Sequence, residues 1–585
     1  GDPVLADDII EGDFTVQAGL SGVYTIGTKY TGNANNFTTI EKATDALFLK
    51  GLSGNVTFEF TDDSYDIYSP GLDQPAWDLS SAILGLGYDA NADVYRTITF
   101  KPSAEKGASR GTVTINLHAQ NGKGITFGQS STNMNPFAII NASIEPDKKG
   151  AYVNNGGYIT FDGGAQKSLK FNIISNEPNH ASVFYLGRGS HHITIKNCLI
   201  ENGTEGTITK TALPRVTYNA ADGFIFQSDV VTSVDGITGY SAGVVNRASI
   251  SNSSIEKAWG VPAMTNHHNV IEGNEIKNFG YGVVSLGIGA NLNSSNLFVK
   301  FYNTNNVIKN NIINRVYGAG VFVGFEDNTD VAYNKIYKIN GGNTGYGVLA
   351  GLESYNSLFG YNNTNLHIYG NQISEVKGTK EAVGIKVLQS QLKLANSDGT
   401  AFTNPSGEEG IDVYSNAIWD VRTANNLTSK GGIYVTTERL NATTPDMPKV
   451  NNYYIDKATV ANNTVIIDDD NIDNSGTISG IAIQNTKNLT LANNAIAVLD
   501  TKSSGPGGCS AVFYQGLKPT ADVLTMNNNA YYTVNGTAVV RYIQLDNNST
   551  IVELGYPTEY TTLDQWRLWT GQDMTSNIGY NFVND

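Results

Sequence analysis

A short motif, asparagine followed two residues later by an aliphatic or aromatic residue, recurs along most of this 585-residue chain. Its intervals vary, but most fall within the range of about 20 to 50 residues that marks a stacked repeat protein. We interpret the longer intervals as one coil plus an inserted loop. The copies begin at Asn197, Asn274, Asn311, Asn334, Asn371, Asn416, Asn463, Asn494 and Asn529, with a degenerate copy at Ser253-Ser-Ile255.

Each unit contains two short runs in which Val or Ile alternates with other residues. The first leads into the asparagine, as in HITIKN (192–197) and LHIYGN (366–371), and the second follows a glycine, as in GVFVGF (320–325) and GIYVTT (432–437). Such alternation predicts half-buried strands. Stacked units would form parallel sheets, and no helix fits between the strands, so a βαβ fold is excluded. The sequence therefore predicts an all-β chain, a parallel β-helix.

The recurring asparagine has a structural explanation and a functional one. At a bend between two strands, inward-pointing backbone groups need hydrogen-bond partners. An asparagine side chain offers a donor and an acceptor and tolerates left-handed backbone geometry, so stacked copies would form a ladder. The alternative is a metal or sugar ligand. We interpret the motif as scaffold.

Both ends of the chain leave the repeat. Near the start, Thr38 and Glu41 fit a capping box before an amphipathic helix that stops at Gly51. Near the end, Trp566 and Trp569 lie close together. We expect both segments to cover the open ends of the solenoid. The predicted divisions are 1–150 for the N-terminal cap and first coils, 151–540 for the core with inserted loops, and 541–585 for the C-terminal cap.

Charge limits the partners. The formal net charge is −16, with 16% charged residues, and no basic stripe is visible, so we expect no nucleic-acid partner. An acidic polysaccharide would be repelled unless a cation or a local Lys/Arg cluster intervened. No apolar run reaches the ~18 residues of a transmembrane helix. Cys198 and Cys509 would lie many coils apart, so we expect both to be unpaired.

The coils resemble the right-handed parallel β-helix repeats of the pectin-lyase-like superfamily. The segments 21–60 and 561–577 are similar to the entry and closing segments of secreted bacterial β-helix proteins. The resemblance implies extracytoplasmic location and a superfamily that includes lyases, hydrolases, epimerases and adhesin-like proteins. The polygalacturonase pattern is not met, because Asn328-Thr329-Asp330 stands without its companion motifs. The pectate lyase motifs are missing too.

Three glutamates are the candidate catalytic acids. Glu326, Glu353 and Glu438 each follow the first aliphatic residue of a second strand by five positions. In register, Glu326 and Glu353 would lie ~4.8 Å apart on adjacent coils. Close carboxylates raise one pKa, as general acid and base or nucleophile pairs require, and their separation would select a retaining or an inverting mechanism. Alternatively, Asp327 and Asp330 would join them to bind Ca²⁺, or the carboxylates are solvated turn residues.

Further outward residues could contact sugar. Lys386, Tyr434 and Arg439 are predicted on the same face, where Lys386 could also serve as a lyase base. Tyr281, Tyr317 and Tyr346 each directly precede glycine at the start of a second-strand segment and could form a column that stacks on sugar or that only packs.

Two histidine pairs occupy equivalent turns. His191-His192 and His267-His268 each precede a first strand, and we expect them two or three coils apart. They could form a metal site, although neither pair has the spacing of a strong zinc motif. Polar turn positions are the alternative.

These observations lead to two hypotheses. The first is a secreted or cell-surface protein that engages a polysaccharide or cell-surface glycan, and that could cleave it as a hydrolase or lyase. The alternative is a non-catalytic adhesin-like or structural surface protein. Enzyme status stays open, no organic cofactor motif is visible, Ca²⁺ is the one cofactor considered, and we expect a monomer.

Overall fold

A computed structural model of the chain describes residues 18–72, 74–81, 83–89, 93–120, 122–128, 157–175, 181–187, 189–203, 217–219, 223–225, 241–247, 265–287, 289–292, 298–351, 363–389, 410–423, 429–437, 455–468, 476–484, 486–500, 508–516, 519–534, 537–544, 558–560 and 562–578.

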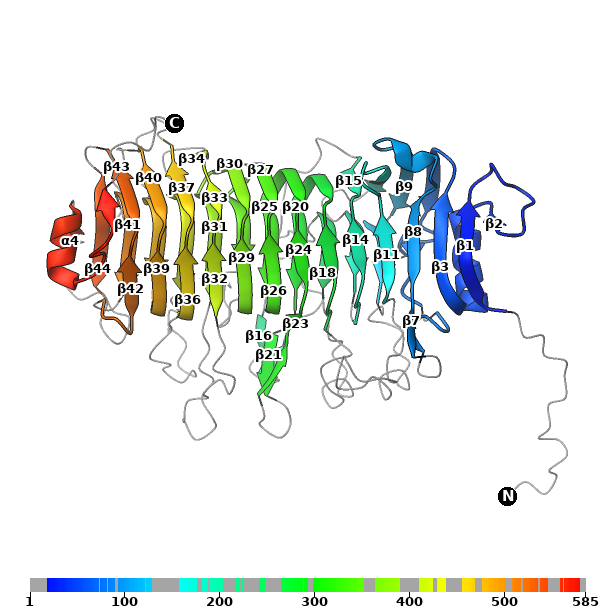
Figure 1. Ribbon diagram of the computed structural model, residues 1–585, viewed down its shortest axis with the longest axis horizontal. Coiled ribbons are helices and arrows are strands. Elements are labelled where there is room, and N and C mark those ends of the chain that lie inside the picture. Colours follow the sequence, from blue (N-terminus) through cyan, green and yellow to red (C-terminus); the bar gives the residue numbers. More distant parts are fainter. Residues whose placement is uncertain are drawn as a thin grey trace, which may run out of the picture.

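The described chain winds into one elongated solenoid, and strands of successive coils lie side by side along it (Figure 1). One wall, which we call the first sheet, contains 15 strands that pair in parallel. In spatial order they are β2 (Asn36–Phe37), β1 (Leu20–Ile26), β3 (Leu52–Phe60), β8 (Ile98–Pro102), β11 (Ile159–Asp162), β14 (Thr194–Lys196), β19 (Val270–Glu272), β24 (Val307–Lys309), β26 (Glu326–Ala332), β29 (Thr364–Tyr369), β32 (Ile411–Tyr414), β36 (Ile455–Ala461), β39 (Thr486–Ala492) and β42 (Leu524–Asn527), with β23 (Asn303–Thr304) also beside β26.

The second sheet contains 25 strands and forms the other walls in two rows. The inner row follows the asparagine turn and contains β4 (Ser64–Tyr68), β9 (Val113–Ala119), β12 (Leu169–Ser175), β15 (Leu199–Asn202), β20 (Glu275–Leu286), β25 (Ile312–Gly324), β27 (Lys335–Asn340), β30 (Gln372–Gly378), β33 (Ala417–Ile418), β34 (Val421–Thr423), β37 (Thr464–Ile467), β40 (Ala495–Val498), β43 (Ala530–Thr533) and β46 (Asn577–Ile578).

The outer row of the second sheet comes next along each coil, and the long strands β20 and β25 contribute to both rows. The outer row contains β5 (Trp77–Asp78), β10 (Lys123–Phe127), β13 (Ser182–Leu186), β18 (Ala242–Arg247), β28 (Thr344–Ala350), β31 (Glu381–Gln389), β35 (Ser429–Thr437), β38 (Ile478–Gln484), β41 (Cys509–Gly516) and β44 (Ala538–Gln544), which β45 (Thr558–Tyr560) joins antiparallel. Three hairpins lie apart, β6 (Gly87–Asp89) with β7 (Val94–Arg96), β16 (Thr217–Asn219) with β17 (Gly223–Ile225), and β21 (Gly289–Leu292) with β22 (Phe298–Phe301).

The core repeats with the coil. The aliphatic residues of the motif lie in register on the inner row and are buried, from Ile276 through Ile313, Ile336 and Ile373 to Ile418. Inward residues of the first sheet, such as Ile368, meet them in one continuous apolar core. Burial on one face with period two is what the alternating runs predicted. The right-handed parallel β-helix predicted from the sequence is confirmed.

The asparagine ladder is also confirmed. From Asn311 to Asn529, each ladder asparagine accepts, on its Oδ1 at 3.0 Å, the backbone N–H of the asparagine one coil earlier. From Asn274 to Asn494, each Nδ2 donates to the Oδ1 of the next asparagine at 3.0–3.1 Å and to a strand carbonyl at 2.8–2.9 Å. The ladder satisfies buried backbone groups at the bend. It runs through Asn274, Asn311, Asn334, Asn371, Asn416, Asn463, Asn494 and Asn529.

The predicted first copy of the motif is misplaced by one residue. Leu199 pairs with Glu275, so Cys198, not Asn197, occupies the ladder position, and its backbone N–H donates to Asn274 Oδ1 at 2.9 Å. Asn197 has φ 55° and aligns with Gly273 at φ 66°. The residue before the ladder, rather than the ladder asparagine, therefore takes the left-handed conformation. Asparagine is common there for that reason, which explains the misalignment.

Other local predictions have mixed outcomes. Ser253-Ser-Ile255 lies outside the described residues, while β14 pairs directly with β19 and β15 with β20. Cys198 and Cys509 are both buried, and neither forms a disulfide, as predicted. Among the described residues, no helix has the length and apolar character that crossing a membrane would require.

The N-terminal helix α1 (Ile40–Lys50) packs Ile40, Ala43 and Leu47 against the core and ends at Gly51, φ 63°. The predicted Thr38–Glu41 capping box is wrong. The N-cap is Thr39, whose hydroxyl accepts from Lys42 N at 3.3 Å, and a lysine at that position cannot complete the box.

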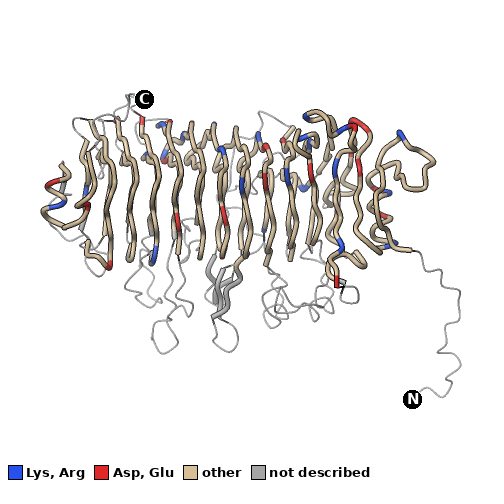
Figure 2. Tube along the Cα trace, viewed as in Figure 1, with Lys and Arg blue, Asp and Glu red and all other residues tan. Residues whose placement is uncertain are grey.

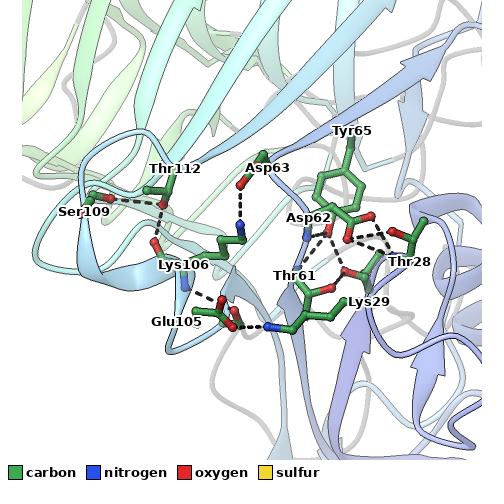
Figure 3. Close-up of polar contacts among 12 residues, drawn as sticks. Thr28, Lys29, Thr61, Asp62, Asp63, Tyr65, Glu105, Lys106, Ser109 and Thr112 are labelled. Carbon is green, nitrogen blue, oxygen red and sulfur yellow. Dashed lines mark hydrogen bonds and ion pairs between the residues drawn. The ribbon is translucent and has the colours of Figure 1, made fainter.

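Polar contacts join the first coils, as Figure 3 shows. The Tyr65 hydroxyl donates to Ile26 O at 2.6 Å and accepts from the backbone N–H of Asp62 at 2.9 Å. The Asp62 carboxylate accepts from Thr28 N at 2.8 Å, and Lys29 contacts Glu105. These bonds hold turns of adjacent coils together where the short 3₁₀ helix η1 (Lys106–Ala108) begins.

At the opposite end, α4 (Leu563–Thr570) lies beyond β44 (Figure 1). A capping box between Thr562 and Gln565 starts this helix. Trp566 is fully buried, and the Trp569 ring lies 5.0 Å from that of Tyr542 on β44. The asparagine ladder ends nearby, where Asn529 Nδ2 donates to Asp573 Oδ1 at 3.1 Å.

Candidate functional site

Glu326 does not face solvent, so the prediction of an outward carboxylate on a second strand is wrong. The residue begins β26 on the first sheet, and its side chain is 0% exposed. Its carboxylate accepts four hydrogen bonds, from Ser285 Oγ at 2.7 Å, Asn303 Nδ2 at 2.9 Å, Asn306 Nδ2 at 3.0 Å and Thr329 Oγ1 at 2.8 Å. Burial raises the pKa of Glu326, and these four donors oppose that shift.

Glu326 is buried because it belongs to a second polar ladder, which runs along the first sheet. Asn266 N donates to Asn303 Oδ1 at 2.9 Å, Asn303 pairs with Glu326, and Glu326 N donates to Asn363 Oδ1 at 3.1 Å. Glu326 thus occupies an asparagine-like position inside a turn. Counting five residues along the sequence missed this, because the chain turns at Phe325, φ 52°.

The other two predicted acids cannot be placed. Glu353 and Glu438 lie outside the described residues, as does Arg439. A pair of carboxylates formed by Glu353 and Glu438 stays a prediction, because the buried Glu326 does not share their predicted outward position.

The predicted calcium ligands have other partners. The Asp327 carboxylate accepts from Asn365 Nδ2 at 2.8 Å, and Asp330 Oδ1 lies 3.1 Å from His367 Nδ1. Within the described ranges, no group of three or more His, Cys, Asp or Glu side chains is arranged to hold a metal ion. The described structure therefore gives the calcium hypothesis no supporting geometry.

The histidine pairs lie on adjacent coils, not two or three coils apart. His191 pairs with His267 in a parallel bridge, and their rings stack at 5.1 Å, while those of His192 and His268 stack at 4.9 Å. Burial lowers the pKa of His267 to about 3 and that of His191 well below its usual value. Neutral, stacked rings indicate packing.

The predicted tyrosine column is only partly present. Tyr281 pairs with Ala319, and Ala319 pairs with Tyr346, so the position between the two tyrosines is filled by alanine. A register irregularity between Phe279 and Tyr281 shifts Tyr317 out of line. Tyr346 remains on the outer row, where it is 5% exposed and packs in an apolar cluster that includes Leu349 and Val383.

Tyr346 belongs to a polar cluster with Glu381 and Lys386. Glu381 Oε1 accepts from the Tyr346 hydroxyl at 2.6 Å and from Lys386 Nζ at 2.5 Å. Lys386 Nζ also lies 5.4 Å from the Tyr346 ring centroid, within cation–π range. The Lys386 and Glu381 side chains are 13% and 21% exposed, so the pair is partly shielded from water yet reachable.

Tyr434 lies next to this cluster because it pairs with Lys386 across β31 and β35. Its hydroxyl donates to Lys430 O at 2.8 Å, and burial raises its pKa. A neutral phenol engaged with a backbone carbonyl is a poor base, so Tyr434 supports the neighbouring residues by packing. The structure thus brings together Tyr346, Lys386 and Tyr434 of the predicted site residues.

Sequence reasoning missed Glu381. The prediction counted forward from the first aliphatic residue of each second strand, whereas Glu381 lies three residues before Gly384. Counting backward as well aligns it with Thr344 and Ser429, its neighbours on adjacent coils. That register was a usable signal.

Comparison with known proteins supports no closer assignment. No protein-family model matches the chain, and no curated protein matches it. Similar solved structures include the Azotobacter vinelandii mannuronan C-5 epimerase AlgE6 A-module, with 12% identity, coverage of 92% of this chain and 93% of that one, and a TM-score of 0.38. The surface adhesin PfbA of Streptococcus pneumoniae has 10% identity, coverage of 90% and 89%, and a TM-score of 0.40.

A mannuronic acid-specific polysaccharide family 6 lyase from human gut microbiota is similar at 12% identity, with coverage of 90% of this chain and 92% of that one and a TM-score of 0.37. At these TM-scores, superposition on the known structures does not justify transferring the role of any residue to this chain. Function has to be argued from the side chains of this chain.

Proposed function

We propose that this protein binds glycan chains on the outward face of the outer row, at Tyr346, Glu381 and Lys386. The observation that supports this most is the use of Glu381 Oε1 for both Tyr346 and Lys386. Oε2 takes no hydrogen bond from the described residues, so it can accept one from a ligand.

The chemistry of the cluster suits sugar hydroxyls. A hydroxyl both donates and accepts, so it pairs with a carboxylate oxygen and an ammonium together. The ion pair holds the two groups in place before a ligand arrives, which reduces the cost of ordering them. A balanced pair of opposite charges favours neutral sugars over strongly charged ones.

Cleavage is the finer possibility. Lys386 could serve as a lyase base only after leaving Glu381, because its Nζ donates to Glu381 Oε1 in this arrangement. Hydrolysis needs a second carboxylate near Glu381, for which Glu353 and Glu438 remain candidates. The non-catalytic, adhesin-like alternative requires binding alone.

We place the protein outside the cytoplasm, as a secreted or surface protein. The location is supported by the sequence resemblance of segments 21–60 and 561–577 to secreted β-helix proteins.

The test is incubation of the protein with neutral and uronic-acid polysaccharides, with and without calcium, scoring binding, new reducing ends and unsaturated products. Glu381→Gln and Lys386→Met should weaken binding several-fold. Glu59→Gln is the matched control, because Glu59 forms an ion pair with Lys101 at 3.3 Å on β3 and β8, away from this face. If both site variants bind as the control does, the proposal is wrong.

A further inference from the structure

Three tyrosines lie together on the first sheet, whereas the site proposed above lies on the outer row of the second sheet. Tyr369 ends β29, Tyr414 ends β32, and the two are in register. Ala332, the partner of Tyr369, ends β26 and is followed by Tyr333. These strands lie side by side in the middle of the solenoid (Figure 1).

Tyr333 lies over a glycine. It has φ 54°, and its backbone N–H donates to Tyr369 O at 2.9 Å. A Cβ added at Gly370 would come within 2.5 Å of both Cδ1 and Cε1 of Tyr333. The ring therefore rests on the glycine backbone, and because the residue is 58% exposed, much of the ring remains open to solvent.

The other two rings stand at an angle to Tyr333. The rings of Tyr333 and Tyr369 meet at 82° with centroids 5.2 Å apart, whereas those of Tyr369 and Tyr414 are parallel, within 2°, at 4.8 Å. Tyr414 thus supports Tyr369 from one side. The arrangement is a corner, with Tyr333 as its exposed floor and Tyr369 as its wall.

A polar row runs beside this corner. Asp330, His367 and Asp412 are in register on the same three strands. His367 Nδ1 lies 3.1 Å from Asp330 Oδ1, and Nε2 lies 3.8 Å from Asp412 Oδ2. Two residues along a strand separate this row from the aromatic rings by about 7 Å, so one ligand can reach both.

We infer that the corner formed by Tyr333, Tyr369 and Tyr414 is a second glycan-contact site, specific for neutral sugars. The apolar face of a pyranose ring would lie on Tyr333, and its hydroxyls would donate to Asp330 or Asp412. The two carboxylates, in a chain of net charge −16, disfavour uronates. The inference rests on the proposed glycan binding and extends it to a second contact surface for the same class of sugar.

Packing alone does not account for the corner. Tyrosines that serve the core are enclosed, as Tyr281 and Tyr514 are at 0% exposure. Tyr333 leaves most of its ring in water, and Gly370 is needed to seat it. An exposed, oriented aromatic ring with hydrogen-bonding groups beside it is a typical arrangement for a small-ligand contact.

The experiment measures the affinity of dextran, galactomannan, xyloglucan and alginate by affinity electrophoresis and calorimetry. Tyr333→Ala should weaken binding of the retained neutral polysaccharide about tenfold. Tyr333→Trp, which keeps a ring, should restore it. Gly370→Ala should weaken it as well, because the added Cβ displaces the ring. Tyr30→Ala is the control, since Tyr30 is also exposed, at 42%, but lies near the N-terminal end.

The outcomes separate this site from the first one. Normal affinity of Tyr333→Ala together with weakened binding by Glu381→Gln would overturn the second site and leave the proposed function intact. Binding of alginate but no neutral polysaccharide would overturn the neutral-sugar assignment. If the wild-type protein binds none of the four polysaccharides, the inference and the proposed function are both refuted. Thermal melting of each variant verifies that it is folded.

Discussion

The asparagine ladder makes a quantitative prediction at its centre. Asn371→Ala removes a side chain that donates to Val331 O at 2.9 Å and to Asn416 Oδ1 at 3.0 Å, and that accepts from the N and Nδ2 of Asn334, both at 3.0 Å. The substitution leaves the apolar core untouched.

The cost follows from the groups left behind. The Val331 carbonyl and the Asn334 backbone N–H would each lose a partner in a buried turn, and an unsatisfied buried group costs about 1–3 kcal/mol. The local free energy of opening should therefore fall by about 3 kcal/mol, which corresponds to a roughly hundredfold increase in the equilibrium constant for opening.

Hydrogen exchange read by mass spectrometry measures this directly. Peptides that cover residues 326–340 and 364–378 should exchange about a hundredfold faster in Asn371→Ala. Asn197→Gly is the matched control, because Asn197 belongs to the same sequence motif but lies outside the ladder, at a left-handed position that glycine accepts. Equal exchange in the two variants would refute the account of the ladder.

Three further predictions concern buried ionisable groups. Burial lowers the pKa of His191 and His267, so folding favours their neutral forms. The stability that this provides is fully present above pH ~6.5 and is lost as pH falls toward 3. At pH 5, His267 alone should lower the free energy of unfolding by about 2 kcal/mol relative to neutral pH. Melting curves at pH 7.5 and 5 check this, and a His267→Gln variant with an unchanged pH dependence would contradict it. Glu326→Gln should lower the free energy of unfolding by about 2–4 kcal/mol, because the new amide nitrogen would face hydrogen-bond donors. Glycan affinity should stay at the wild-type value. Weakened affinity in a folded variant would restore Glu326 as a site residue. Lys430 Nζ lies 2.7 Å from Asp500 Oδ2, and both side chains are 0% exposed. Lys430→Met should therefore lower the free energy of unfolding by about 3–5 kcal/mol, and adding Asp500→Leu should recover part of that loss, as denaturant unfolding would show. A double variant no more stable than Lys430→Met would argue against the pair.

Much of the fold was predictable because its signal repeats. Ile313, Ile336 and Ile373 recur with an asparagine two residues before each, and only stacking buries all of them at once. The error at Asn197 has a physical cause, since asparagine suits both the ladder position and the left-handed residue before it. Only the inter-coil register, which puts Cys198 opposite Asn274, separates the two.

The candidate site was less predictable because it depends on pairing across coils. Glu381 and Tyr346 are 35 residues apart in sequence and meet only through the register of β28 and β31. Lys386 was found because it alternates outward within one strand, which the sequence shows. Glu326 was misjudged because a bend before it moves the residue to a different sheet, and no local pattern reports that turn.

The most direct test of glycan binding at the outer row is hydrogen exchange with and without the polysaccharide that the protein retains. Binding at Tyr346, Glu381 and Lys386 predicts that peptides covering residues 344–350 and 381–389 become protected when that polysaccharide is added, while residues 52–60 do not change. Retention without protection of either segment, or no retention of any polysaccharide, would contradict the proposed function.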